Sequence, residues 1–236
     1  MTDTTIIGLA TLAASLGVFH TLIGPDHYLP FVMIARARNW SLARTNMLTF
    51  VCGLGHVLSS VVLGFVGIAF IALMEKIEWL EGARGSLAAW MVIAFGLVYM
   101  VWGLRQAFRH HTHTHDHVHA DGEHHHHEHA HVGGHTHVHD SKKSITPWVL
   151  FIVFVFGPCE VLIPTLMVPA AEHNYGAVAL IATVFGIATI GTMLVTVSLA
   201  TSGLKLIRLG RVERFSHVIA GAVIAGSGLA MKLLGL

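Results

Sequence analysis

Charged residues are scarce in this sequence, and their scarcity excludes an ordinary soluble domain. Only 11% of the 236 residues are Asp, Glu, Lys or Arg, whereas soluble domains carry about 25%. Hydrophobic residues make up 54% of the chain. The net charge is only +1, so the charge balance gives no reason to expect a nucleic acid partner. The sequence therefore predicts a membrane protein surrounded by the lipid bilayer.

Cysteine is also scarce, because Cys52 and Cys159 are the only two in the chain. Two thiols allow at most one bridge, which excludes the disulfide framework of a small secreted domain. The N-terminus lacks the basic region of a signal peptide, so we expect the first apolar run to remain as a permanent span. A nucleotide-binding motif is absent as well, and we expect an ion gradient or a partner to supply energy.

Long apolar runs are abundant, and six of them are long enough to cross a bilayer, for which about 20 residues suffice. The first run is interrupted at Pro25 and Pro30, and the fourth at Pro158 and Pro164. Proline breaks or kinks a helix interior. We expect an all-α polytopic membrane protein with six transmembrane helices, of which the first and fourth are broken at Gly-Pro. The six runs cover residues 5–34, 47–73, 87–108, 148–171, 177–199 and 218–236.

Basic residues are concentrated in alternate loops. Eleven of the fourteen Lys and Arg lie in or beside the loops after the first, third and fifth runs. Cytoplasmic loops are enriched in Lys and Arg. We therefore expect an integral protein of the plasma (inner) membrane, with these three loops in the cytoplasm and both termini outside.

The two halves of the chain resemble each other. A Gly-Pro pair followed by polar residues occurs at residues 24–27 in the first run and at 157–160 in the fourth. An odd number of spans ends a unit on the opposite side of the membrane from its start, so a second unit of three spans enters from the other side. We therefore expect two inverted three-helix repeats. They cover residues 1–108 and 145–236, with a loop at 109–144 between them. Inverted repeats with broken helices near the bilayer midplane are typical of secondary transporters.

Residues around the first Gly-Pro pair predict a metal site. Asp26 and His27 follow the pair directly, and His20 lies shortly before it. A carboxylate inside a membrane is costly and indicates a functional site, and imidazole suits Zn, Cu, Fe and Ni. His56, flanked by glycine in the second run, is a further candidate ligand. The alternative is that Asp26 and His27 only pair with each other, and that His56 only packs.

The second Gly-Pro pair offers a different set of side chains. Glu160 is expected to complete the metal shell or to carry a coupling proton. Cys159 is either a soft metal ligand or a small buried hydrophobe. Thr189 and Thr192 in the fifth run are candidates for supporting hydrogen bonds around the site, or for hydrogen bonds between helices.

The loop at residues 109–144 holds fifteen of the twenty histidines. Such a polar tract cannot bury a core, so we expect it to be disordered, and histidine-rich tracts bind metal. In the cytoplasm the loop would collect, buffer or sense metal ions; the alternative is a solvated linker. The loop histidines expected to bind metal are His113, His115, His117, His119, His124, His125, His126, His127 and His129.

The segment from His20 to His27 resembles the first-span signature of the nickel/cobalt transporter superfamily. The resemblance is nearest to its branch of urease-accessory-like and high-affinity nickel-transport membrane proteins. Residues 157–160, the glycine-flanked His56 and residues 189–193 resemble the same branch. The resemblance implies a nickel or cobalt permease in which His20, Asp26 and His27 are essential.

The sequence thus predicts a secondary transporter of divalent transition-metal ions, nickel or cobalt first and zinc next. It would work by alternating access around the intramembrane site, with the histidine-rich loop collecting metal. We expect no catalytic residue and no resident cofactor, and hence no enzyme. A second copy of the chain and a cytosolic metallochaperone stay open as partners.

One alternative is an accessory subunit that delivers metal. Another is a membrane thiol-redox electron carrier using Cys159, although such carriers place Cys after Pro in both repeats and Asp26 stands at the first place here.

Overall fold

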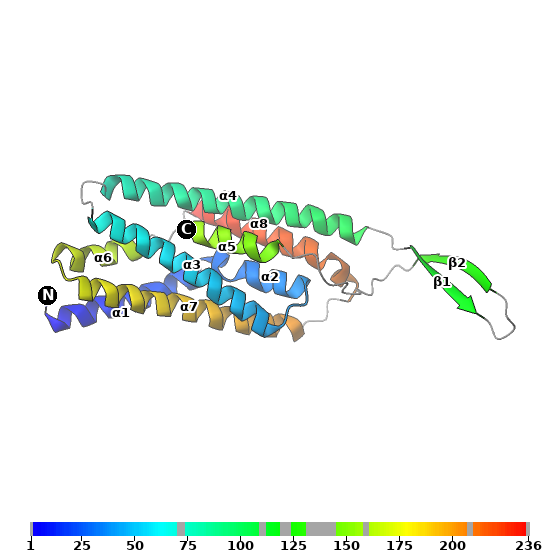
Figure 1. Ribbon diagram of the computed structural model, residues 1–236, viewed down its shortest axis with the longest axis horizontal. Helices are drawn as coiled ribbons and strands as arrows, with labels where there is room; N and C mark the ends of the chain where they lie inside the picture. Colours follow the sequence, from blue (N-terminus) through cyan, green and yellow to red (C-terminus); the bar gives the residue numbers. More distant parts are fainter. Residues whose placement is uncertain are drawn as a thin grey trace.

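The computed structural model describes most of the chain, and its membrane part is entirely helical (Figure 1). The described residues are 2–69, 74–108, 112–118, 124–130, 145–157, 161–206 and 210–234. The helices are α1 (Asp3–Ile23), α2 (Leu29–Ala37), α3 (Leu42–Ala69), α4 (Met74–Ala107), α5 (Thr146–Phe156), α6 (Leu162–Ala171), α7 (Tyr175–Leu206) and α8 (Ser216–Leu234). Two short 3-10 helices, η1 (Pro25–His27) and η3 (Gly210–Phe215), precede α2 and α8.

Five helices of the described part are long and apolar enough to cross a membrane: α1, α3, α4, α7 and α8. The expectation of an integral membrane protein is therefore confirmed. The six-span inverted repeat is not confirmed. The run at residues 148–171 is broken beside its Gly-Pro pair, as the sequence predicts, but α5 and α6 are each shorter than the roughly 20 residues that a crossing needs. α5 ends at Phe156, with Gly157 as its C-cap.

The first apolar run is broken where the sequence predicts. Gly24 adopts an extended conformation that ends α1, and Pro25 opens the 3-10 turn η1. Pro30 lies in the first turn of α2, where a missing N–H costs little because that position has no intrahelical partner. The chain therefore leaves α1, turns once and continues as α2, whose residues Phe31 and Ile34 are fully buried.

Close contacts between helices hold the bundle together. The most extensive contact joins α4 to α8, and the next joins α1 to α7. A Cβ atom at Gly96 of α4 would overlap the backbone of Ala225, and one at Gly221 of α8 would overlap the backbone of Met100. Small residues permit this approach of helix backbones in membranes. α3 packs on α7 and α5, and α2 on α8 and α7.

The connections of the chain gather at two ends of the bundle (Figure 1). The α2–α3 link and the beginning of α8 lie at the end that carries the hairpin described below, whereas the N-terminus lies at the opposite end. This arrangement agrees with alternate loops sharing one side. The assignment of that side to the cytoplasm stays a prediction.

A two-stranded hairpin occupies part of the histidine-rich loop, where the sequence predicts disorder. Strands β1 (Thr112–Val118) and β2 (His124–Ala130) pair antiparallel. Their register sets His113 against His129 and His115 against His127. Alternation of histidine with Thr and Val has the period of a strand, and these β-branched residues favour extended chain. This pattern accounts for β1, whereas β2, which begins with four consecutive histidines, does not show it.

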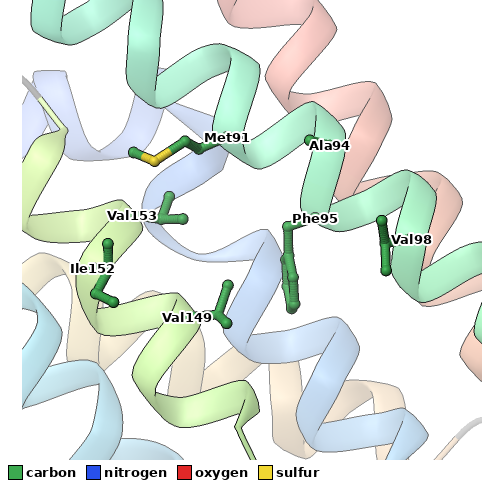
Figure 2. A pocket seen from close by; sticks show the side chains of 7 residues that line it. All are labelled: Met91, Ala94, Phe95, Val98, Val149, Ile152 and Val153. Carbon is green, nitrogen blue, oxygen red and sulfur yellow. The ribbon is translucent and has the colours of Figure 1, made fainter.

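An apolar hollow of about 350 Å³ lies between α4 and α5 (Figure 2). It forms beside α5, which spans only part of the length of α4 (Figure 1). Its lining offers no ionisable side chain, so it provides neither a metal ligand nor a redox group. The residues around it are Met91, Ala94, Phe95, Val98, Val149, Ile152 and Val153.

Candidate functional site

Three histidines from different elements meet inside the bundle. His20 lies in the last turn of α1, His27 in η1 and His56 in the middle of α3. The ring centroids are 4.6 Å apart for His20 and His27, and 5.1 Å apart for His27 and His56. One nitrogen from each ring can be chosen so that all three lie within 4.8 Å of one another. The break after α1 creates this cluster, because the turn of η1 places His27 beside His20.

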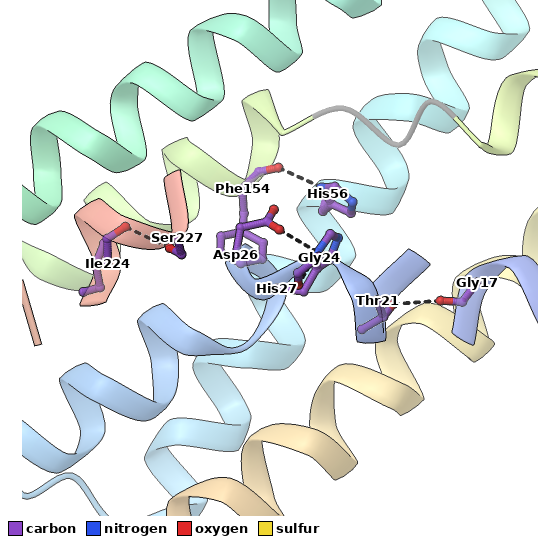
Figure 3. Close-up of polar contacts among 9 residues, drawn as sticks. All are labelled: Gly17, Thr21, Gly24, Asp26, His27, His56, Phe154, Ile224 and Ser227. Carbon is purple, nitrogen blue, oxygen red and sulfur yellow. Dashed lines mark hydrogen bonds and ion pairs between the residues drawn. The ribbon is translucent and has the colours of Figure 1, made fainter. Parts of the chain in front are cut away.

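Hydrogen bonds engage the Nδ1 atom in two of the three rings, those of His27 and His56 (Figure 3). The Nδ1 atom of His27 lies 3.1 Å from Oδ1 of Asp26 and 3.2 Å from the carbonyl oxygen of Gly24. The Nδ1 atom of His56 lies 3.3 Å from the carbonyl oxygen of Phe154. A carbonyl and a carboxylate only accept, so Nδ1 is the donor in both rings. The neutral tautomer then leaves a lone pair on each Nε2 atom.

The Nε2 atoms of His20, His27 and His56 are all buried, and none has a hydrogen-bond partner within the described part of the chain. A buried polar atom left unpaired costs about 1–3 kcal/mol. Most buried polar atoms in native proteins are paired, and exceptions call for an explanation such as an ion or a water molecule. Three such atoms in one place have the chemistry of a site for a transition-metal ion.

Asp26 lies beside this cluster, and its described contact is with His27 rather than with the other rings. The nitrogen atoms of the three histidines form the candidate ligand group, which does not include the carboxylate. The geometry thus matches the alternative in which Asp26 pairs with His27. That pairing leaves Nε2 of His27 unpartnered, so it is compatible with a metal bound by the histidine.

The remaining predicted site residues are distributed as follows. Cys159 and Glu160 lie outside the described residues, although Gly157 just before them is close to His56: a Cβ atom there would lie 3.1 Å from Nδ1. The hydroxyl of Thr192 donates to the carbonyl oxygen of Ala188 at 2.7 Å, within its own helix. The hydroxyl of Thr189 is buried without a partner in the described part and faces Gly17 of α1.

The loop histidines are described only as backbone. Their strands β1 and β2 pair in the hairpin, and the positions of their side chains lie outside the description. His119 is outside the described residues altogether. The prediction that these histidines bind metal is therefore untested.

Arg84 is a further polar residue near the cluster that the sequence analysis did not select. Its guanidinium group is buried and donates to the hydroxyl of Ser59 and to the carbonyl oxygens of Val155 and Gly157. The predicted third span begins at residue 87, which leaves Arg84 in a loop, whereas the apolar part of α4 begins at Gly82. A cation inside a membrane span is the signal that identifies such a residue.

Together, these features define a polytopic helical membrane protein with a buried histidine cluster at a broken helix. The model of a family described as Cytochrome C biogenesis protein transmembrane region matches residues 28–230. The match covers most of the chain, and the chain belongs to that family. No curated protein and no solved structure matches the sequence.

The resemblance to the nickel/cobalt transporter superfamily is wrong, because the family match assigns the chain elsewhere. The matched region begins at Tyr28, immediately after the segment from His20 to His27 that carried the resemblance. A Gly-Pro break with neighbouring histidines is a short local pattern, and it reports the chemistry of a helix break rather than ancestry. Membership in the cytochrome c biogenesis family favours the thiol-redox alternative over nickel or cobalt transport.

Proposed function

We propose that this protein binds a divalent transition-metal ion between His20, His27 and His56 and carries it across the bilayer. The observation that supports the proposal is the convergence of three buried Nε2 atoms without partners within the described part. Neutral imidazole is a preferred ligand of Zn, Cu, Fe and Ni. Three such ligands leave further coordination positions open, as a site that must release its ion requires.

Outer contacts support the same proposal. Metal-bound histidines commonly donate their other N–H group to a carboxylate or a backbone carbonyl, which orients the ring and raises its basicity. His27 makes such a contact with Asp26, and His56 makes one with Phe154. The carboxylate of Asp26 also offsets part of the charge of a dication, which three neutral rings leave unneutralised. We therefore assign Asp26 to the orientation of His27 and to charge balance.

The packing of the helices is compatible with movement of an ion past this site. If the two halves correspond, α1 and α2 of the first half match α5 and α6 of the second, and α3 matches α7. α1 and α2 both pack on α7, and α5 and α6 both pack on α3. This correspondence supports an inverted relation between the two halves of the chain, as in many secondary transporters. The most extensive contact, between α4 and α8, joins the two halves. We infer that the broken segments after α1 and after α5 move, rather than one half of the chain against the other.

A binding experiment tests the proposed site. Purified protein is titrated with Co²⁺, whose visible absorption reports its ligands, and His20→Ala, His27→Ala and His56→Ala are compared with wild type. Each variant is expected to lose the high-affinity absorption band. His173→Asn is the matched control, because His173 is exposed, has φ 54°, and Asn tolerates that conformation. All fifteen histidines of residues 109–144 are replaced by serine in all samples, so that the loop does not compete with the intramembrane site.

Transport is tested separately in proteoliposomes that contain a metal-sensitive dye. Zn²⁺, Ni²⁺, Co²⁺ and Mn²⁺ are offered with and without a pH gradient. Wild-type protein is expected to move at least one of these ions, and His27→Ala to move none. Binding without transport would restrict the function to metal binding. Equal transport by wild type and His27→Ala would show that the ion does not pass this site.

Thiol-redox electron transfer is the second candidate, and the family match is the observation that favours it. In the described part the free thiol is Cys52, which is 1% exposed on α3. An electron carrier would use Cys159 at the second break, so Cys159→Ser should abolish the transfer of electrons from a dithiol reductant inside proteoliposomes to a disulfide outside them. Metal transport should survive that substitution at least in part. A protein that transfers electrons and binds no Co²⁺ would establish the redox function instead.

A further inference from the structure

Arg84 is placed to control the orientation of His56 from a third helix. The residue lies on α4 and is 9% exposed within a candidate membrane span. A buried cation in a membrane is costly and is retained for a function. Its Nη2 atom lies 3.0 Å from the hydroxyl of Ser59 on α3 and 2.9 Å from the carbonyl oxygen of Val155 at the end of α5.

These contacts fix the end of α5. The last carbonyl groups of a helix have no partner within the helix, and a cation is stabilising at that end. Arg84 binds the carbonyl oxygens of Val155 and, at 3.4 Å, of Gly157. The carbonyl oxygen of Phe154, one residue earlier, accepts the hydrogen bond from Nδ1 of His56. Arg84 thereby holds the backbone segment that sets the tautomer of His56.

The same guanidinium group also contacts the helix that carries His56. The hydroxyl of Ser59 accepts a hydrogen bond from Arg84 and donates one to the carbonyl oxygen of His56 at 2.8 Å. α4 itself is fixed to α8, since Gly228 of α8 packs against the backbone of Ala89 and Ile93, near Arg84. Arg84 therefore connects the α4–α8 pair to both the backbone and the hydrogen-bond acceptor of His56.

We propose that Arg84 is a positioning residue for His56, and that it links movement of the broken segment after α5 to the affinity of the histidine cluster for metal. The proposal rests on the proposed metal site for its effect on affinity. Its effect on the ring of His56 does not depend on a metal. The two parts can therefore be measured separately.

Nitrogen NMR of histidine-labelled full-length protein, without metal, measures the ring of His56 directly. Its signals are assigned by comparison with His56→Gln. In wild type they should report a proton on Nδ1 and none on Nε2. Arg84→Gln is expected to give a mixture of tautomers at His56 while the signals of His217 stay unchanged. Arg105→Gln is the matched control, because Arg105 is an exposed arginine on the same helix, and it should change neither.

Co²⁺ titration of the same variants measures the effect on the site. Arg84→Gln is expected to weaken binding by roughly tenfold, as for other groups that orient metal ligands, and Arg105→Gln to leave it unchanged. If Arg84→Gln fails to fold, Arg84→Lys keeps the buried charge and takes its place in both measurements. The proposal would be overturned if a folded Arg84 variant gave unchanged His56 signals, or if that variant bound Co²⁺ as tightly as wild type. Altered His56 signals in a protein whose wild type binds no Co²⁺ would retain the positioning role and reject the metal function.

Discussion

Asp26 and His27 are adjacent residues with different roles, and one substitution separates them. Removal of a group that orients a metal ligand commonly lowers affinity by about 10–100-fold, whereas removal of a ligand abolishes the site. Asp26→Asn should therefore weaken Co²⁺ binding within that range and leave the shape of the absorption band similar. His27→Ala should abolish the band. Equal loss in both variants would show that Asp26 is itself a ligand.

Gly157 is a position where a single methyl group should disturb the site. A Cβ atom there would lie 3.1 Å from Nδ1 of His56 and 3.2 Å from the carbonyl oxygen of Phe154. Gly157→Ala is expected to displace one of these groups, to weaken their hydrogen bond and to raise the dissociation constant for Co²⁺ several-fold. Gly191→Ala is the control, since a Cβ atom at Gly191 meets no heavy atom within 4 Å among the described residues. Equal affinities would show that the segment around Gly157 yields without effect.

The histidines of the site were predictable from the sequence, because their residue types and their places in apolar runs are local features. Histidine and Gly-Pro in an apolar run indicated His20, His27 and His56, and the structure brings these three together. The role of Asp26 could not be derived, because the choice between binding a metal and binding His27 depends on the conformation of η1. Arg84 was missed because the predicted third span begins at residue 87, whereas the apolar part of α4 begins at Gly82.

At the scale of elements, the contact between α4 and α8 carries a prediction about stability. A Cβ atom at Gly221 would overlap the backbone of Met100 and Gly96, neither of which can move aside as a side chain would. Gly221→Ala should therefore lower the free energy of unfolding by about 1–3 kcal/mol, the usual cost of overpacking.

Thermal unfolding in detergent provides the measurement, and the control lies on the same helix. A Cβ atom at Gly226 meets no heavy atom within 4 Å among the described residues, so Gly226→Ala should leave the midpoint unchanged or raise it slightly. Helix propensity favours Ala over Gly in both variants. A midpoint for Gly221→Ala as high as that for Gly226→Ala would contradict the close packing of the two helices.

The helical elements were largely predictable, and the failures have physical causes. Apolar runs of bilayer length gave α1, α3, α4, α7 and α8. The break in the run at residues 148–171 was predicted from its Gly-Pro pair, but the length of the run gave one span, whereas α5 and α6 are each too short to cross a bilayer. The hairpin was missed because polar composition was given more weight than the period-two alternation of β1.

At the scale of the whole molecule, the hairpin lies outside the helical bundle, beyond the end of α4 (Figure 1). If the loop collects metal for the proposed site, replacing residues 110–139, which hold all of its histidines, by a Gly/Ser linker of equal length should raise the metal concentration at half-maximal transport. The maximal rate should stay unchanged, because the intramembrane histidines are intact. Proteoliposome uptake over a range of metal concentrations measures both quantities. An unchanged concentration dependence would reduce the loop to a buffer.

The shortness of α5 has a consequence for how the protein is made. Its 11 residues extend over about 16 Å, roughly half of the hydrocarbon core. Such a segment is a poor substrate for insertion on its own as it leaves the ribosome. α6 is equally short and packs on α7, which is synthesised after it. α5, by contrast, packs on α3 and α4, which are synthesised before it. We therefore expect α6 to take its place in the bilayer only after α7 has emerged, so that the second broken segment is completed later than the helices that precede it.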